Sequence, residues 1–231
     1  MNESPSRSRI RLFLEGAAER PVDPVVLAAH WRMARVELRA AGAAAVARNP
    51  NAPAKLRGAW GRALAGGPCL WPAPCGYDLF FNVQGAVTAR LELPKPFTLL
   101  LMAEAGDLVI ALTLFGVATD WAGEAADAPV RAARAGLDGA TGRRALEIIH
   151  RDIAIAGEAP LADLSAGAVL RFLSPVSLRQ GGAHHAEPAS MITSLANRIG
   201  GLARWQGLRL ALNGAALKAE ATRLGAAAEW V

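Results

Sequence analysis

The sequence has few of the features that mark secreted, membrane-spanning or disulfide-rich proteins. It contains two cysteines in 231 residues, which is too few for a disulfide framework. No apolar run reaches the roughly 18 residues of a membrane-spanning helix, and the N-terminal stretch MNESPSRSRIRLF has no apolar region of a secretory signal. These absences predict a soluble cytoplasmic protein that has no membrane partner.

Patterns of metal ligands are scarce as well. Cys69 and Cys75 are separated by five residues, a wider gap than the roughly two to four residues of a zinc knuckle, and no second ligand pair lies nearby. The adjacent histidines His184 and His185 lie far along the chain in RQGGAHHAEP, a stretch that indicates a loop. We therefore predict that the two cysteines pin a Pro-rich turn, and that the protein has no metal site and no cofactor.

Lysine is the third rare residue. Lys55, Lys95 and Lys218 are the only lysines among 25 basic residues, and the rest are arginines. The guanidinium group binds phosphate in a bidentate manner and stays charged at any working pH, so this bias and the net charge of +5 favour a polyanionic partner. GC-rich coding, which the abundance of Ala and Gly also indicates, is an alternative origin of the bias.

What the sequence does contain is enough apolar residue to form a core, because 52% of the residues are hydrophobic and 19% are charged. Hydrophobic periodicity predicts the elements of the first 160 residues. The first elements are a strand at 31–39 with a bulge between Met33 and Val36, and, after a connection of small residues at 40–50, a helix at 51–65 that buries Leu56, Trp60 and Leu64. Extended segments follow at 78–87 and 89–93, and then a hairpin of two strands around Ala105-Gly106. The last elements are a helix at 124–135, a Gly-rich turn and a strand at 145–157.

This order of strand, helix, two strands, helix and strand predicts an α+β fold with a ferredoxin-like (RRM-like) domain over residues 1–160. A basic helical and Gly-rich element lies near residues 121–145.

Residues 161–231 begin the pattern again, with a strand at 165–178, a helix from Pro188 and a helix at 208–224. The first of these helices places Met191, Leu195, Ile199 and Leu202 on its apolar face, and the chain ends at AAAEWV, where a strand begins. We predict a second ferredoxin-like domain that is incomplete at its C-terminus.

Several of these segments together resemble one family. The segments are KLRGAWGRAL, CLWPAPCGYDLFF, LPKPFTLLL, DLVIALTLFGVA, AGLDGATGRR, RFLSPVSLRQGG and MITSLANRIGGL, which follow one another across residues 27–205. In this order they resemble the CRISPR-associated RAMP superfamily, specifically its pre-crRNA-processing endoribonucleases with tandem ferredoxin-like domains. The richness in arginine is similar to the branch attached to type IV CRISPR systems.

The resemblance implies cleavage of RNA without a metal ion. A ribose 2′-OH attacks the adjacent phosphate, the 5′ oxygen leaves and a 2′,3′-cyclic phosphate remains, which requires in-line geometry, a proton acceptor and cations around the phosphorane. Two features depart from the family. The stretch 51–67 contains no histidine, and the chain ends at Val231 before the Gly-rich loop that usually follows a tryptophan-containing strand.

The residues expected at the catalytic site come from the first strand and the first helix. We predict that His30 is the proton acceptor and that Arg32, Arg35, Lys55 and Arg57 stabilise charge on the phosphate. The alternatives are a structural histidine at the strand edge and ordinary solvated surface charge. His150 is interpreted as structural because apolar residues flank it.

A second set of basic residues is expected to bind the RNA backbone. Its members are Arg39, Arg62, Arg131, Arg134, Arg143, Arg144, Arg179, Arg198 and Arg204. No GxxxxGK[ST] motif of a P-loop occurs. The sequence is thus interpreted as an endoribonuclease that cuts CRISPR repeat RNA beside a stem-loop and stays bound to the crRNA hairpin, with other CRISPR effector subunits as partners. The alternatives are a cleavage-inactive crRNA-binding subunit and a ferredoxin-like scaffold with no nucleic-acid role.

Overall fold

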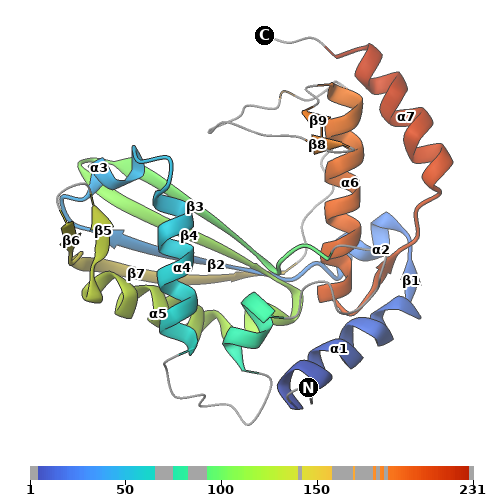
Figure 1. Cartoon of the computed structure of the whole chain (residues 1–231). Helices are drawn as coiled ribbons and strands as arrows, with labels where there is room; N and C mark the ends of the chain where they lie inside the picture. Colours follow the sequence, from blue (N-terminus) through green and yellow to red (C-terminus); the bar gives the residue numbers. More distant parts are fainter. Residues whose placement is uncertain are drawn as a thin grey trace.

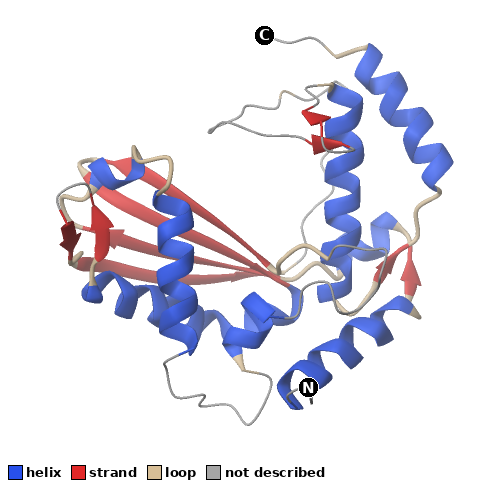
Figure 2. Cartoon of the chain, viewed as in Figure 1, coloured by secondary structure: helices blue, strands red, loops and turns tan. Residues whose placement is uncertain are grey.

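The protein is a mixed α+β fold built around one four-stranded antiparallel sheet, here seen in a computed structural model (Figures 1 and 2). The structure describes residues 5–65, 75–82, 93–139, 142–157, 169, 179–180, 183–184 and 187–228. The strand order across the sheet is β3 (Phe97–Glu104), β4 (Asp107–Phe115), β2 (Met33–Ala40) and β7 (Ile148–Ala156). Strand β3 is therefore an edge strand of this sheet.

Two helices connect these strands and lie on the same face of the sheet (Figure 1). Helix α4 (Ala52–Ala65) links β2 to β3, and helix α5 (Ala122–Ala135) links β4 to β7. The predicted order of strand, helix, two strands, helix and strand is therefore confirmed. Each helix joins two parallel strands that have a third strand between them, which interlocks the two halves of the unit.

The core forms between the sheet and these helices. On β2 every second side chain, from Ala34 to Ala40, is completely buried, as the alternation in the sequence predicts. Helix α4 contributes Trp60, whose ring centroid lies 4.7 Å from that of Phe97 and 5.1 Å from that of Phe80. Burial of one such large side chain stabilises the fold by about 1.5–3 kcal/mol. The predicted burial of Leu56, Trp60 and Leu64 is confirmed.

The hairpin between β3 and β4 closes at the predicted residues. Ala105 and Gly106 both have positive φ, 50° and 90°, as in a two-residue turn that follows the twist of the strands. A second, short hairpin, β5 (Leu137–Gly139) with β6 (Gly142–Arg144), occupies the predicted Gly-rich turn.

The C-terminal part forms a pair of helices that stands beside the sheet (Figure 1). Helix α6 (Pro188–Trp205) packs against α7 (Gly214–Ala226), and against α1 (Pro5–Ala18) from the other end of the chain. Between them, β10 (Arg209–Leu210) pairs in parallel with β1 (Pro21–Val22), which precedes α2 (Pro24–Ala29). Within the described residues, every helix is too short or too polar to cross a lipid bilayer.

The end of α6 is fixed to the sheet unit by several hydrogen bonds. The indole Nε1 of Trp205 donates to the carbonyl of Pro94 at 2.9 Å. Gln206 makes two hydrogen bonds with the backbone of Arg32: its Oε1 accepts from the Arg32 amide at 3.1 Å, and its Nε2 donates to the Arg32 carbonyl at 3.0 Å. The amide of Gly116 donates to the same carbonyl at 2.9 Å. We call these contacts the α6 joint.

Several local predictions are wrong. The bulge predicted between Met33 and Val36 is absent from the pairing of β2 with β4 and β7, and the irregularity lies at Arg39/Ala40 opposite β7. The connection at 40–50 contains a short helix, α3 (Ala44–Ala47). Residues Asp78–Asn82, predicted to be extended, form a helical turn, η1. Short apolar runs do not distinguish a buried strand from a buried helical turn, which explains this error.

The predictions for the C-terminal part are confirmed only in part. On α6, Met191 and Leu202 are buried, but Leu195 and Ile199 are 45% and 43% exposed, so the predicted apolar face is too wide. Residues 208–213 include β10 instead of a helix. The strand predicted at 165–178 lies outside the described residues except for Val169. Two tandem ferredoxin-like domains are not shown.

Candidate nucleic-acid interface

A pocket of about 390 Å³ lies between residues of α4, the start of β3 with the segment before it, and α6. Ligand sites in proteins have volumes of roughly 300–1,000 Å³. The residues that line the pocket are Pro53, Ala54, Arg57, Lys95, Phe97, Leu99 and Arg198. Phe97 and Leu99 are paired with Leu114 and Leu112, so they share the helix-covered face of the sheet. The pocket is therefore on the helix side of edge strand β3.

Three cationic side chains from distant parts of the sequence meet at this pocket. Arg57 comes from α4, Lys95 from the segment before β3 and Arg198 from α6. The lining contains no carboxylate. In the part of the chain that the structure describes, none of the three forms an ion pair, whereas Arg32, Arg35 and Arg39 do. Positive charges that converge without a neutralising partner create a potential that attracts an anion.

Lys95 is the most enclosed of the three cations. Its ammonium nitrogen lies 4.9 Å from the centroid of the Phe81 ring, and the Arg57 guanidinium lies 6.0 Å from the same centroid. Burial, and then the positive charge of Arg57, lower the pKa of Lys95 to about 8. At neutral pH the side chain is therefore mostly charged but can readily release a proton.

The backbone of α4 adds to the positive potential. Pro53 and Ala54 are in the first turn of this helix, where the partial positive charge of the helix dipole is located. That turn contains no acidic residue to offset the charge. Arg57 follows Pro53 by one helical turn, so the helix presents its N-terminal end and a guanidinium group to the same pocket.

The position of Arg198 depends on the α6 joint. Arg198 lies seven positions before Trp205, whose indole donates to the carbonyl of Pro94, the residue directly before Lys95. Gly201 lies between them, and a Cβ atom at this position would overlap the ring of Pro94. Close approach of α6 to the Pro94-Lys95 segment thus brings the second guanidinium group to the pocket.

Two guanidinium groups and one ammonium group around a pocket of this size can hold a phosphate group. Guanidinium groups bind the non-bridging oxygens in a bidentate manner, and they also stabilise the extra negative charge of a pentacoordinate phosphorus. Phe97 and Leu99 form apolar walls of the pocket, while Arg57 and Arg198 are themselves exposed.

Comparisons of the chain with known protein families, with curated proteins and with solved structures find no match.

The five residues predicted for catalysis are not brought together. Arg57 lines the pocket, and Lys55 is exposed on the same helix but does not line it. Arg35 lies on the face of the sheet opposite α4, because its neighbours Ala34 and Val36 point into the core, and its guanidinium pairs with Glu37 at 3.3 Å.

The other two predicted catalytic residues lie outside the pocket lining. Arg32 pairs with Asp120 at 2.9 Å and also donates to the hydroxyl of Thr119, both in η2 (Gly116–Trp121). His30 is exposed at the C-terminal end of α2, where its Nδ1 lies 2.9 Å from the carbonyl oxygen of Val26.

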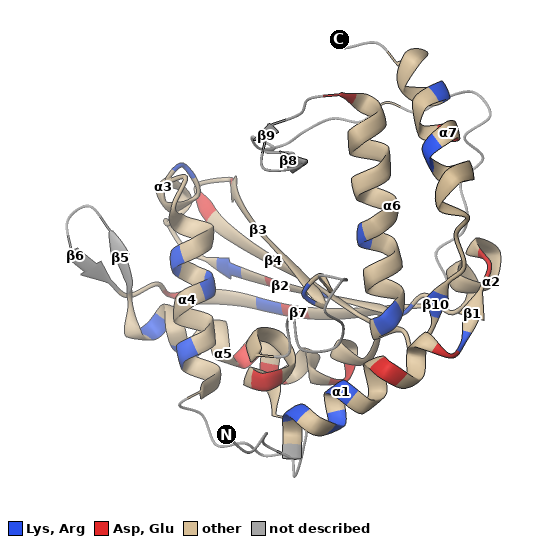
Figure 3. Ribbon diagram, turned by 45° about the vertical axis from the view of Figure 1, so that its right-hand side comes forward, with Lys and Arg blue, Asp and Glu red and all other residues tan. Residues whose placement is uncertain are grey.

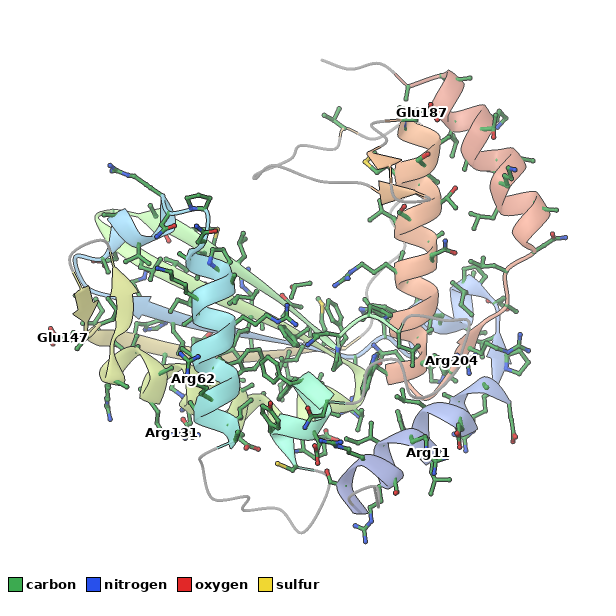
Figure 4. All side chains as sticks on the ribbon, in the orientation of Figure 1. Arg11, Arg62, Arg131, Glu147, Glu187 and Arg204 are labelled. Atoms are coloured by element: carbon green, nitrogen blue, oxygen red, sulfur yellow. The ribbon has the colours of Figure 1, made fainter. Side chains whose placement is uncertain are left out.

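The residues predicted to bind RNA are spread over three regions. Arg198 lines the pocket. Arg62, Arg131 and Arg134 are exposed on α4 and α5, two helices that carry several basic residues in Figure 3, and Figure 4 shows Arg62 and Arg131 at neighbouring positions. The Arg131 guanidinium donates to the carbonyl of Ala63 at 3.3 Å, which ties the two helices together.

The remaining predicted RNA ligands contribute less to a common surface. Arg39 lies on the sheet face opposite the helices and pairs with Glu104 at 2.9 Å. Arg204 is half-buried at the end of α6, and burial, with a smaller effect of Arg209, lowers the pKa of its guanidinium group. For Arg143, Arg144 and Arg179 the structure describes the backbone but not the side chains.

Lys95 is the functional candidate that the sequence analysis missed. It is one of three lysines in an arginine-rich chain, and it stands between two prolines in LPKPF, where the backbone is restricted. This pattern was the available signal.

The prediction for the cysteines stays open, because Cys69 lies outside the described residues. Cys75 is a free thiol, and its backbone amide donates to the hydroxyl of Ser6 at 2.7 Å.

Proposed function

We propose that this protein is a metal-independent endoribonuclease that cleaves CRISPR repeat RNA beside a stem-loop and remains bound to the mature crRNA. The observation that carries the proposal is the convergence of Arg57, Lys95 and Arg198 on one pocket without a neutralising carboxylate in its lining. An RNA backbone supplies the repeated phosphate groups that such a pocket binds.

The arrangement of strands supports the same proposal. The sheet order β3-β4-β2-β7 with α4 and α5 on one face is the arrangement expected of one ferredoxin-like domain. The resemblance of the sequence to the tandem ferredoxin-like endoribonucleases predicts such a domain over residues 1–160. The second domain, over residues 161–231, remains part of the proposal.

In the proposed reaction the scissile phosphate lies between the guanidinium groups of Arg57 and Arg198. The ribose 2′ oxygen forms a bond to phosphorus while the bond from phosphorus to the 5′ oxygen breaks. The products are a 2′,3′-cyclic phosphate and a 5′-hydroxyl end. Because negative charge accumulates on the non-bridging oxygens in the transition state, two positioned cations accelerate this step more than they strengthen binding of the ground state.

A cleavage-inactive crRNA-binding subunit of a CRISPR effector is the second candidate. The observation that favours it is the composition of the pocket, which includes no histidine to accept a proton. Both candidates require the same cationic pocket to contact RNA phosphate.

Incubation with repeat RNA in EDTA separates the two candidates. We expect single-site cleavage that leaves a 2′,3′-cyclic phosphate, because no step of the reaction uses a metal ion. The same hairpin with 2′-O-methyl riboses is the control, and we expect it to be bound but left intact. Binding of both RNAs without cleavage would support the inactive subunit. No binding of either RNA at low salt would contradict both candidates.

A further inference from the structure

We propose that Lys95 is the catalytic residue that accepts the proton of the attacking 2′-hydroxyl group, an inference that rests on the proposed function. The side chain reaches the pocket from the segment directly before β3, between Arg57 on α4 and Arg198 on α6. It would therefore touch the sugar next to a phosphate that both guanidinium groups hold.

Among the groups that line the pocket, Lys95 is the only one that can exchange a proton near neutral pH. Guanidinium groups stay protonated at any working pH, so Arg57 and Arg198 serve as fixed charges. The other four lining residues have apolar side chains; they are Pro53, Ala54, Phe97 and Leu99. The lowered pKa of about 8 that burial and Arg57 give Lys95 places a usable fraction of neutral amine at physiological pH.

Two features around Lys95 favour the neutral amine, namely the burial of its side chain and the positive charge of Arg57 on α4. The Phe81 ring of η1, 4.9 Å from the Lys95 nitrogen, favours the ammonium form instead, but the net effect lowers the pKa of Lys95. No carboxylate lines the pocket to stabilise the ammonium form. Lys218 on α7 is exposed, so it provides a matched lysine without these neighbours.

The proton balance of the step is complete without a further reactant. The neutral amine of Lys95 takes the proton as the 2′ oxygen bonds to phosphorus. The departing 5′ oxygen takes a proton from water, and Lys95 then returns its own proton to the resulting hydroxide. No redox change occurs, and the products are the cyclic phosphate and the 5′-hydroxyl end.

The test is the substitution Lys95→Arg, which keeps the positive charge but cannot give a neutral amine near neutral pH. We expect single-turnover cleavage of repeat RNA at pH 7.5 to fall by about a hundredfold to ten-thousandfold, with RNA affinity changed by less than about threefold. The matched control, Lys218→Arg, should cleave at the wild-type rate.

The pH profile distinguishes proton transfer from a structural role. The cleavage rate is measured at a protein concentration below the dissociation constant for RNA, so that the profile reports the RNA-free protein. Below pH 8 the wild-type rate should increase about tenfold per pH unit, and it should level off near pH 8, the pKa of Lys95 in the RNA-free protein. The Lys95→Arg variant should lose this plateau. In the RNA-free protein, acylation of Lys95 by an amine-reactive ester should also level off near pH 8.

The outcomes separate this inference from the proposed function. If wild-type protein cleaves and Lys95→Arg cleaves equally well with the same pH profile, Lys95 is not the proton acceptor, but the proposed endoribonuclease stands. If wild-type protein binds repeat RNA and never cleaves it, the proposed cleavage is wrong and the role of Lys95 is wrong with it. An acylation profile of Lys95 that has no plateau near pH 8 would also overturn the inference.

Discussion

The double substitution Arg57→Ala and Arg198→Ala is expected to slow single-turnover cleavage of repeat RNA by about a hundredfold to ten-thousandfold. Removal of one positioned donor to a transition-state oxyanion typically lowers the rate by about a hundredfold or more. The two effects need not multiply fully, because both groups would act on the same phosphate. The measurement is the cleavage rate at saturating protein, so that weaker RNA binding does not obscure the chemical step.

A double variant with the same change in net charge controls for general electrostatics. Arg151→Ala with Arg223→Ala removes two arginines whose charges are already paired, with Asp127 at 2.9 Å and with Glu220 at 2.5 Å, and neither residue lines the pocket. We expect this control to cleave within about threefold of wild type, because exposed ion pairs contribute little. Equal rates for the two double variants would show that the pocket does not hold the scissile phosphate.

The substitution Gly116→Ala is expected to destabilise the protein by about 2–5 kcal/mol. Gly116 has a φ of +59°, a left-handed conformation that is costly for alanine, and a Cβ atom there would overlap the backbone carbonyl of Trp205. The new methyl group would push the end of α6 away from η2 and open the α6 joint. Chemical denaturation measures the free energy of unfolding, and RNA affinity should fall as well, because Arg198 would lose its fixed position.

The control for this variant is Gly123→Ala in the first turn of α5. A Cβ atom at Gly123 would have nothing within 4 Å, and its backbone φ is not positive. Alanine in a helix is favoured over glycine by up to about 1 kcal/mol, so we expect Gly123→Ala to leave stability unchanged or to raise it. If Gly116→Ala proves as stable as Gly123→Ala, the α6 joint does not hold the helix as described.

Much of the sheet unit could be predicted because its signals are local. The alternation along β2, the spacing of Leu56, Trp60 and Leu64, and the Ala105-Gly106 turn each specify an element within about ten residues of sequence. Helix α1, in contrast, was not predicted, although Ile10, Leu14 and Ala17 are buried in it. Their spacing of three to four residues was a signal that could have been used.

The candidate site could not be predicted because it depends on long-range packing. Arg198 follows Lys95 by 103 positions in the sequence, and the hydrogen bond from Trp205 to Pro94 brings their segments together. No sequence spacing contains that information. The separation of Arg35 from Lys55 and Arg57, in contrast, follows from the alternation of β2, since Arg35 must point away from the face that α4 covers.

The salt dependence of RNA affinity tests the central claim most directly, namely that Arg57 and Arg198 contact RNA phosphates. The affinity of a 2′-O-methyl repeat hairpin with a single-stranded flank is measured between about 50 and 200 mM salt for wild type, for Arg57→Ala with Arg198→Ala, and for Arg151→Ala with Arg223→Ala. Each lost phosphate contact to a single strand should reduce the slope of log affinity against log salt by about 0.7, and so by about 1.4 for the pocket variant. The control variant should keep the wild-type slope. Identical slopes for all three proteins would contradict the claim.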